Sequence, residues 1–421
     1  MDHKAAPVSF DRVDARIFGA IVGIAGLIYL PLAWRLSQGL FLDYWNLAFD
    51  FDPEKFVAAY AGDFNYRGEF RHALIMLLYP FGFVLREAGL GAKGAAAILT
   101  GVLGALRPGL IYLCVRALGG TRAISAAMAV LFAVSGVQII LAIVVESYGP
   151  AMDALLLGWL LIFLRQGGAT LRPGSTIGAG VANVGITLSN ISQLGLAHMA
   201  QEIAQFGVRR GLVRTVVWSA TIVLVAGILA VPIWYDVWLG VLTHPVQTLK
   251  EIYWASFFAG PKTGASGITG IFTIMAAVSP AYSFIDIPGG ISMWDFRELI
   301  YTRLGWATVV VWLGLLGAGI WMWLRRPGWR MIGLLLLASF SFNVLMHTSF
   351  QFRNSIYIYA GHSYVPLFLL AAGAVVGVRG WKLPAAICLL AAMMAMVNFP
   401  PALQLVTGFD SVNVSCTAPC L

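Results

Sequence analysis

Long apolar runs alternate with polar connectors along the whole chain, and these runs predict its main elements. About nine of them are long enough to cross a membrane, because roughly 20 apolar residues span the hydrocarbon core. Only closed patterns of backbone hydrogen bonds are stable in lipid, so each run predicts a transmembrane helix. The predicted spans are residues 17–34, 95–118, 122–145, 148–164, 212–233, 304–324, 331–346, 362–378 and 383–405. We therefore expect an all-α, polytopic membrane protein with a single transmembrane domain over residues 1–421.

Two further stretches do not have the pattern of a simple span. Residues 72–85 contain Pro80 and stop at Arg86, which favours a re-entrant or interfacial segment. Residues 177–204 begin apolar and then become polar, which fits either one crossing or a hairpin that enters and returns. We prefer a first stretch that does not cross together with a hairpin. The alternative is that both stretches cross once.

The basic residues between the spans support this preference. It places most of the basic connectors on one side, which the positive-inside rule assigns to the cytoplasm. The N-terminus is then cytoplasmic and the C-terminal tail lies outside, in a bacterial-type inner (plasma) membrane. The basic positions concerned are Lys4, Arg12, Arg16, Arg116, Arg122, Arg165, Arg172, Arg209, Arg210, Arg214, Arg325, Arg326, Arg330, Arg379 and Lys382.

The composition agrees with a membrane protein and excludes other classes. Hydrophobic residues make up 59% of the chain and charged residues 11%, whereas about a quarter of the residues of a soluble domain are charged. We attribute the net charge of +8 to basic connectors that face anionic lipid. Membrane lipids are therefore expected partners. Nucleic acid is not, because the sequence contains no basic soluble module interleaved with aromatic residues.

Acidic side chains gather in the first predicted outer loop, residues 37–94, which includes the re-entrant stretch. Asp43 lies about nine residues beyond the first span, and Asp50 and Asp52 follow it. A carboxylate at such a place can accept a proton from an attacking hydroxyl. Alternatively, these acids hydrate the loop or cap short helices, as Asp52 before Pro53 would.

Glu146 stands in a short connector between two predicted spans. A carboxylate at membrane level is costly unless something pairs with it, which favours a role as a metal ligand or in orienting an acceptor. Capping of the following span is the simpler interpretation. Arg107 and Asp153 lie within spans, and we expect them to form a buried ion pair.

Several basic and aromatic residues are candidates for binding a phosphate. Arginine suits this task because its planar guanidinium donates two parallel hydrogen bonds. Arg67 and Arg71 lie in the first outer loop, where local pairing with Asp63 or Glu69 is the alternative, and Arg353 lies in another outer loop. The long, aromatic-rich outer loop 234–303 can form an acceptor cleft or lie on the membrane. The candidate set is completed by His72, His362 and Tyr148.

The order of these features resembles the front half of the GT-C superfold of membrane glycosyltransferases. An N-terminal span precedes an acidic outer loop and a re-entrant-looking stretch that contains a Tyr-Pro pair (LIMLLYPFGFVL, residues 74–85). A span that closes on YLCVRALG (residues 112–119), a basic turn and a span that leads to VVESY (residues 144–148) come next. The resemblance covers residues 15–205.

The resemblance implies a fold, a reaction and residue roles. Enzymes of this superfold transfer a sugar from a polyprenyl-phosphate carrier to an acceptor, here a lipid or a glycan, on the outer face of the membrane. Their first outer loop supplies a catalytic acid and the second outer connector often adds another, which Asp43 and Glu146 match. Asp43 would be the general base, with Asp50 and Asp52 in reserve. Asp43 and Glu146 are also candidate ligands of a divalent ion, Mg or Mn. The chain departs from the family pattern in lacking an adjacent acidic pair and a soluble C-terminal domain.

Two other functions are compatible with the same sequence. A carrier or flippase of lipid-linked sugars would share the charged outer vestibule but would need polar residues along the inner halves of several spans. The polar stretch 187–202 favours that model. A non-enzymatic scaffold of an envelope-polysaccharide assembly complex would tolerate alanine at the outer-loop acids.

Overall fold

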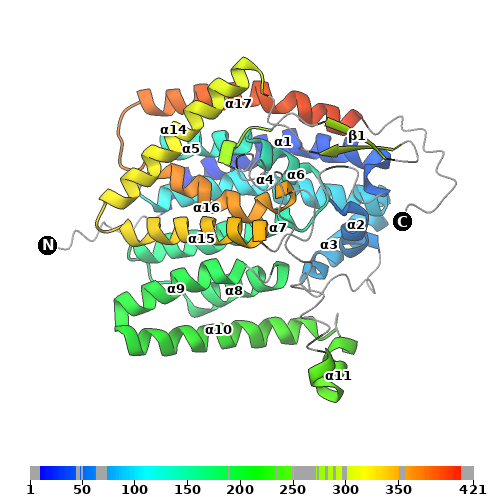
Figure 1. Cartoon of the computed structure of the whole chain (residues 1–421), viewed down its shortest axis with the longest axis horizontal. Coiled ribbons are helices and arrows are strands. Elements are labelled where there is room, and N and C mark those ends of the chain that lie inside the picture. The colour runs from blue at the N-terminus through cyan, green and yellow to red at the C-terminus, as the bar shows by residue number, and fades with distance from the viewer. Residues whose placement is uncertain are drawn as a thin grey trace.

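The computed structural model describes residues 10–43, 48, 51–62, 74–187, 190–232, 235–248, 250, 272, 275–279, 283–287, 291–295, 301–349 and 356–408. Long helices lie side by side in a bundle, with most of their axes close to horizontal in Figure 1. The longer helices are α1 (Arg12–Gln38), α4 (Gly91–Ala117), α5 (Arg122–Ala133), α6 (Gly136–Ile143), α7 (Tyr148–Gln166), α8 (Pro173–Ile186), α9 (Asn190–Phe206), α10 (Val208–Ala230), α11 (Tyr235–Thr243), α14 (Arg303–Arg325), α15 (Arg330–Ser349), α16 (Ala360–Ala372) and α17 (Lys382–Thr407). The shorter helical segments are η1 (Leu40–Asp43), α2 (Pro53–Val57), η2 (Ala58–Gly62), η4 (Ile75–Leu78), α3 (Tyr79–Leu85), η5 (Arg86–Leu90) and η6 (Ile356–Tyr359). An antiparallel hairpin, β1 (Ser283–Ile287) and β2 (Ile291–Asp295), is the exception to an otherwise helical fold.

The predicted all-α membrane-type architecture is confirmed, whereas the predicted count of spans is not. Seven helices of the described chain are long and apolar enough to cross a membrane, or up to eight if α5 and α6, which are bent by 65° relative to each other, form one span. The predicted span 362–378 corresponds to α16, which is only 13 residues long. All residues of α16 are buried, so this apolar run packs inside the bundle.

The first helix is longer at both ends than its apolar run. It begins at Arg12 because Asp11 caps it: the Asp11 side chain accepts from the backbone N–H groups of Val13 and Asp14, and Asp14 reaches back to the Asp11 N–H. It ends at Gln38, so Asp43 follows almost directly and not about nine residues later.

Five connectors and the N-terminus of α1 meet at one end of the bundle, which we call the basic end. Buried Asp14 accepts hydrogen bonds from Arg116 Nε at 2.9 Å and from Tyr112 Oη at 2.6 Å, which ties α1 to the α4–α5 turn. Gln166, at the end of α7, donates to the Gly328 carbonyl at 3.0 Å in the α14–α15 turn. Arg326 in that turn donates to the Val376 carbonyl, which follows α16.

This arrangement agrees with the threading that we preferred. Residues 75–90 form short helical segments, of which α3 packs on η2 and on α4 and does not run the length of the bundle (Figure 1). Helices α8 and α9 form a hairpin that packs on α7, and α10 packs on the outer side of that hairpin (Figure 1). The basic connectors therefore share one end.

The bend between α5 and α6 is held open by groups from elsewhere in the chain. Asn398 of α17 donates to the Val134 carbonyl at 2.8 Å, a carbonyl that a straight helix would have paired internally. The backbone N–H of Gly136, at the start of α6, donates to the Ala277 carbonyl at 3.0 Å. Ser279 N–H in turn donates to Asn398 Oδ1 at 2.8 Å. The redirected α6 then delivers the chain to Glu146.

Gly82 provides a test of the packing between α3 and η2. A Cβ at Gly82 would lie 2.0 Å from the Tyr60 carbonyl oxygen, which is a backbone atom and cannot move aside easily. We expect Gly82→Ala to lower the unfolding free energy by about 1–3 kcal/mol through overpacking. Detergent-solubilised protein can be unfolded by heat or by increasing sodium dodecyl sulfate to measure this.

Gly23 of α1 is the matched control, because a Cβ there meets nothing within 4 Å. Gly23→Ala should leave the unfolding free energy within about 0.5 kcal/mol of the parent. Equal stabilities of the two variants would contradict the close packing of α3 on Tyr60.

Candidate functional site

Three of the predicted acids lie together at the end of the bundle opposite the basic end. We call it the acid end and define it by Asp43, Asp52 and Glu146. Asp43 closes the turn after α1, Asp52 precedes α2, and Glu146 precedes α7, so all three stand where a long helix has left the bundle interior or is about to enter it. The turn η1, which contains Asp43, packs against α2.

Glu146 is the most unusual of these acids because its carboxylate is buried. It is 2% exposed, and the backbone N–H of Asp52 donates to its Oε2 at 2.9 Å. The N–H of Ser147 donates to its Oε1 at 3.1 Å. Among the described residues no ion pair includes Glu146. Burial, reinforced by the nearby negative charge of Asp52, raises the pKa of Glu146 to about 8. The raised pKa favours the protonated form of the Glu146 side chain at neutral pH.

The contact between Asp52 and Glu146 bears on our two earlier interpretations. Asp52 stands at the N-cap of α2, as the Asp-Pro pair predicted, but its side chain makes no capping hydrogen bond to that helix. Glu146 likewise contacts the residue before α7 and does not cap α7 itself. Two segments far apart in the sequence are thus joined by the Glu146 carboxylate.

A buried polar layer lies beneath Glu146. The hydroxyl of Tyr60 donates to the Glu146 carbonyl at 2.9 Å. Arg107 is fully buried and pairs with Asp153 at 3.1 Å, which is the ion pair that we predicted. Arg107 also donates from Nη1 to the Leu141 carbonyl at 3.0 Å, near the end of α6. The Arg107–Asp153 pair therefore fixes the last turn of α6 and with it the connector that carries Glu146.

Asp43 has a different environment. Its side chain is 34% exposed, and its Oδ2 lies 2.5 Å from Nζ of Lys93 at the start of α4. Lys93 places a positive charge beside this partly exposed carboxylate. Asp43 is thus an accessible carboxylate, whereas Glu146 is an enclosed one.

Tyr148 and His362, two candidates for substrate binding, lie in contact with each other. Their rings meet edge to face at 5.2 Å, and His362 Nδ1 lies 2.9 Å from Oδ1 of Asn190. Next to them runs a polar seam between α9, α15 and α16. It consists of Asn190, Gln193, Ser339, Asn343, His347, His362 and Ser363.

The seam contains buried polar atoms that have no hydrogen-bond partner among the described residues. These atoms are Gln193 Oε1, Ser339 Oγ, Asn343 Oδ1, His347 Nε2 and Ser363 Oγ. The amide groups of Gln193 and Asn343 do bridge helices, since both donate to the His362 carbonyl, at 3.4 and 3.3 Å. Thr187 does not share a helix face with Asn190 and Gln193, because α8 ends before Thr187 and α9 begins at Asn190.

Five of the candidate residues lie outside the described residues. They are Asp50, Arg67, Arg71, His72 and Arg353. Their assigned roles stay predictions, as does an acceptor cleft in the long outer loop. Within the described parts of the chain, no group of three or more His, Cys, Asp or Glu side chains can hold a metal ion. The role of Asp43 and Glu146 as ligands of a divalent ion stays a prediction.

Sequence reasoning missed Lys93, Tyr60 and the structural role of Arg107 at this end. Lys93 lies just before a predicted span, at a position where a cation can reach the interface, and its opposite charge to Asp43 was the available signal. Tyr60 carried no such signal, since its partner is a backbone carbonyl. Comparisons with protein-family models, with curated proteins and with solved structures found no match to this chain.

The raised pKa of Glu146 predicts a pH-dependent reactivity. A hydrophobic carbodiimide modifies protonated carboxyl groups in apolar surroundings. We expect it to label Glu146 at pH 6 to 7 and to lose that labelling as the pH rises through about 8. Peptide mapping by mass spectrometry after labelling measures this directly.

The sign of the accompanying stability change follows from linkage. A carboxyl group with a folded pKa above its unfolded pKa stabilises the fold below the unfolded value and loses that contribution as the pH rises through the folded value. Between about pH 5 and 9 the parent should therefore lose more stability than Glu146→Gln, which cannot titrate. Labelling of Glu146 only below about pH 5 would contradict its burial.

Proposed function

We propose that this chain is an integral membrane glycosyltransferase that uses a polyprenyl-phosphate-linked sugar and works at the acid end. The observation that carries the proposal is the contact of Glu146 with Asp52, which brings the second connector to the acidic first loop. The short helices α2 and α3 add to it, because they occupy the same end between α1 and α4. A donor with its prenyl tail in the bilayer would present its sugar phosphate there.

In this proposal Asp43, Glu146 and Lys93 divide the chemistry of the acid end. The acceptor hydroxyl attacks the anomeric carbon, its proton passes to Asp43, and the bond between that carbon and the phosphate oxygen breaks. The electron pair leaves with polyprenyl phosphate. Protonated Glu146 and the Lys93 ammonium group are suited to stabilise the charge that develops on that phosphate. No step in this scheme uses a metal ion.

The partners and the orientation belong to the same proposal. The donor is a polyprenyl-phosphate sugar, and the acceptor is a lipid or glycan. Clustering of the basic connectors at one end supports a cytoplasmic basic end, with the acid end on the outer face of an inner (plasma) membrane. Arg67, Arg71 and Arg353 stay candidates for holding the phosphate.

One observation favours a second candidate, a flippase of lipid-linked sugars. Polar residues continue along α9 from Asn190 and Gln193 at the acid end to Gln201 and Glu202 at the basic end. Together with the unpaired atoms of the polar seam, this path offers hydrogen bonds to a head group in transit. Such a carrier would move the donor without consuming it.

Replacing Asp43 tests the proposed enzyme. Asp43→Asn keeps the size of the side chain but cannot accept the proton, so we expect transfer to fall about 100-fold or more. Membranes that contain the variant are incubated with a radiolabelled polyprenyl-phosphate sugar, and the labelled product is counted. Intact carrier-sugar should accumulate in cells that express only the variant.

Glu87→Gln is the matched control, because Glu87 is 57% exposed and pairs only locally with Arg86 among the described residues. It should leave transfer unchanged. Full transfer by Asp43→Asn would refute the assignment of the base. A chain without transferase activity that moves carrier-sugar across vesicles would identify the flippase, and activity that tolerates alanine at all three acids would favour the scaffold.

A further inference from the structure

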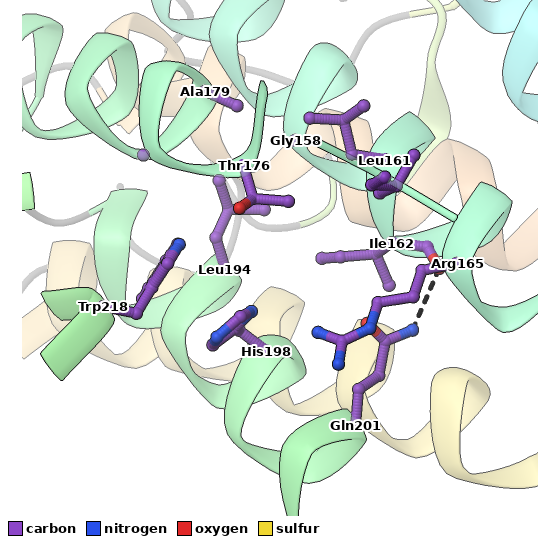
Figure 2. Close-up of a pocket in the computed structure, with 12 residues that line it drawn as sticks. Gly158, Leu161, Ile162, Arg165, Thr176, Ala179, Leu194, His198, Gln201 and Trp218 are labelled. Atoms are coloured by element: carbon purple, nitrogen blue, oxygen red, sulfur yellow. Dashed lines mark hydrogen bonds between the residues drawn. The ribbon is translucent and has the colours of Figure 1, made fainter. Parts of the chain in front are cut away.

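A crevice at the basic end has the chemistry of an anion site. It lies between α7, α8, α9 and α10, and Figure 2 shows the side chains that line it. Its cavity volume is about 30 Å³, which is room for a water molecule or for one oxygen of a larger group at its mouth. Its floor is apolar and includes Gly158, Leu194 and Ala179.

Two of the polar side chains that line the crevice, Arg165 and Trp218, are hydrogen-bond donors only. Arg165, 21% exposed, extends its guanidinium group towards His198 (Figure 2). The His198 ring stacks on Trp218, with ring centres 4.3 Å apart. The indole Nε1 of Trp218 is buried and has no hydrogen-bond partner in the part of the chain that the structure describes. Such an orphan donor is rare in a folded protein and calls for an acceptor.

The charge around the crevice is positive. Glu202, with 3% of its side chain exposed, is shared by two guanidinium groups: Arg165 Nη2 lies 2.6 Å from its Oε1, and Arg214 pairs with its Oε2. One carboxylate therefore balances only one of two arginines. Exposed Arg172, Arg209 and Arg210 add to the positive charge of this end. A charged donor set of this kind binds phosphate oxygens.

The neighbouring surface identifies the molecule that carries the phosphate. Val213 and Val217 of α10, five residues and one residue before Trp218, are 58% and 59% exposed. In a membrane-type helix such a face lies against hydrocarbon chains. A basic pocket between membrane helices that opens beside an apolar face is the arrangement that binds anionic lipid head groups.

We propose that this crevice binds the phosphate of an anionic phospholipid, with Arg165 and the Trp218 N–H as donors and the acyl chains along α10. The site is separate from the acid end and does not depend on the proposed transferase reaction. Its occupant would also link α10 to α7 across the α8–α9 hairpin, because Trp218 and Arg165 belong to those two helices.

Native mass spectrometry of the whole protein in a neutral detergent tests the proposal. The protein is titrated with phosphatidylglycerol and with phosphatidylcholine of the same chain length. We expect phosphatidylglycerol to bind about tenfold more tightly. Arg165→Gln should abolish this preference, and Trp218→Phe, which removes one donor and keeps an aromatic ring, should weaken it about three- to fivefold.

Arg209→Gln is the matched control, because it removes a charge from the same end at an exposed residue that does not line the crevice. It should change binding less than about twofold. Equal losses of affinity for phosphatidylglycerol in Arg165→Gln and Arg209→Gln would mean that binding depends only on nonspecific electrostatic attraction. That result would overturn the proposal. If Arg165→Gln fails to fold because Glu202 loses its partner, the lipid preference is measured in Trp218→Phe and Arg165→Lys instead. An unchanged preference in Trp218→Phe would then overturn it.

Competition with glycerol phosphate and with inorganic phosphate tests whether the bound phosphate belongs to a lipid. Neither should displace phosphatidylglycerol at millimolar concentration, because neither has chains to lie along α10. Displacement by glycerol phosphate or inorganic phosphate would mean that the crevice serves a soluble phosphate, and it would overturn the lipid as occupant. Equal affinity for the two lipids would do the same.

Discussion

Ionisable groups are buried in this bundle mainly where another group compensates their charge, and this constraint divides the molecule into two chemically different ends. Asp14 meets Arg116 and Arg122, Glu202 meets Arg165 and Arg214, and Arg107 meets Asp153. Apart from the Glu202–Arg214 pair, which joins the consecutive helices α9 and α10, these pairs tie together helices that do not follow one another in the chain. Since an unpaired charge in an apolar interior costs several kcal/mol, these pairs fix which helices can be neighbours. Glu146 is an exception, because it is buried without an ion-pair partner among the described residues. Its burial raises its pKa and so favours the protonated form.

The pairs also cross-link the connectors of the basic end. The α4–α5 turn, the end of α7, the α14–α15 turn and the segment after α16 are connected through side-chain bonds to backbone carbonyls or to carboxylates. The acid end contains shorter helical segments, joined by fewer such bonds in the described residues. A site that must admit a substrate is more easily built from short segments of that kind than from the ends of long, cross-linked helices.

The architecture could be predicted from the sequence because membrane helices depend on one strong signal, the length of an apolar run. Even the hairpin of α8 and α9 followed from the positions of the arginines. The signal failed where burial inside the protein replaced burial in lipid, as in α16. It also failed at the ends of α1, where Asp11 and Asp14 extend the helix through hydrogen bonds that hydropathy does not measure. The Arg107–Asp153 pair was predictable, because two opposite charges within spans have few other partners.

The site was predictable only as a list of residues, because their relations depend on tertiary contacts. The sequence places Asp43, Asp52 and Glu146 on one side, but it cannot say that Asp52 contacts Glu146 through its backbone or that Lys93 contacts Asp43. These contacts change the chemistry that we assign. The sequence alone does not show how the environments of these acids differ, whereas the structure distinguishes an accessible carboxylate beside a lysine from an enclosed one.

That distinction is the physical basis for assigning opposite roles to the two acids. A group-transfer reaction that moves a proton from an acceptor and releases a phosphate needs a proton acceptor on one side and a donor on the other. Paired titratable groups acquire such roles when their environments differ. Asp43, which is solvent-accessible and next to an ammonium group, can be reached by a hydroxyl. Glu146 is enclosed, and its burial together with the nearby charge of Asp52 raises its pKa, which suits it to donate. Because the Arg107–Asp153 pair holds the end of α6, the donor is also held in place by a contact that lies inside the membrane-type core, and its position therefore depends on the bundle rather than on the outer loops.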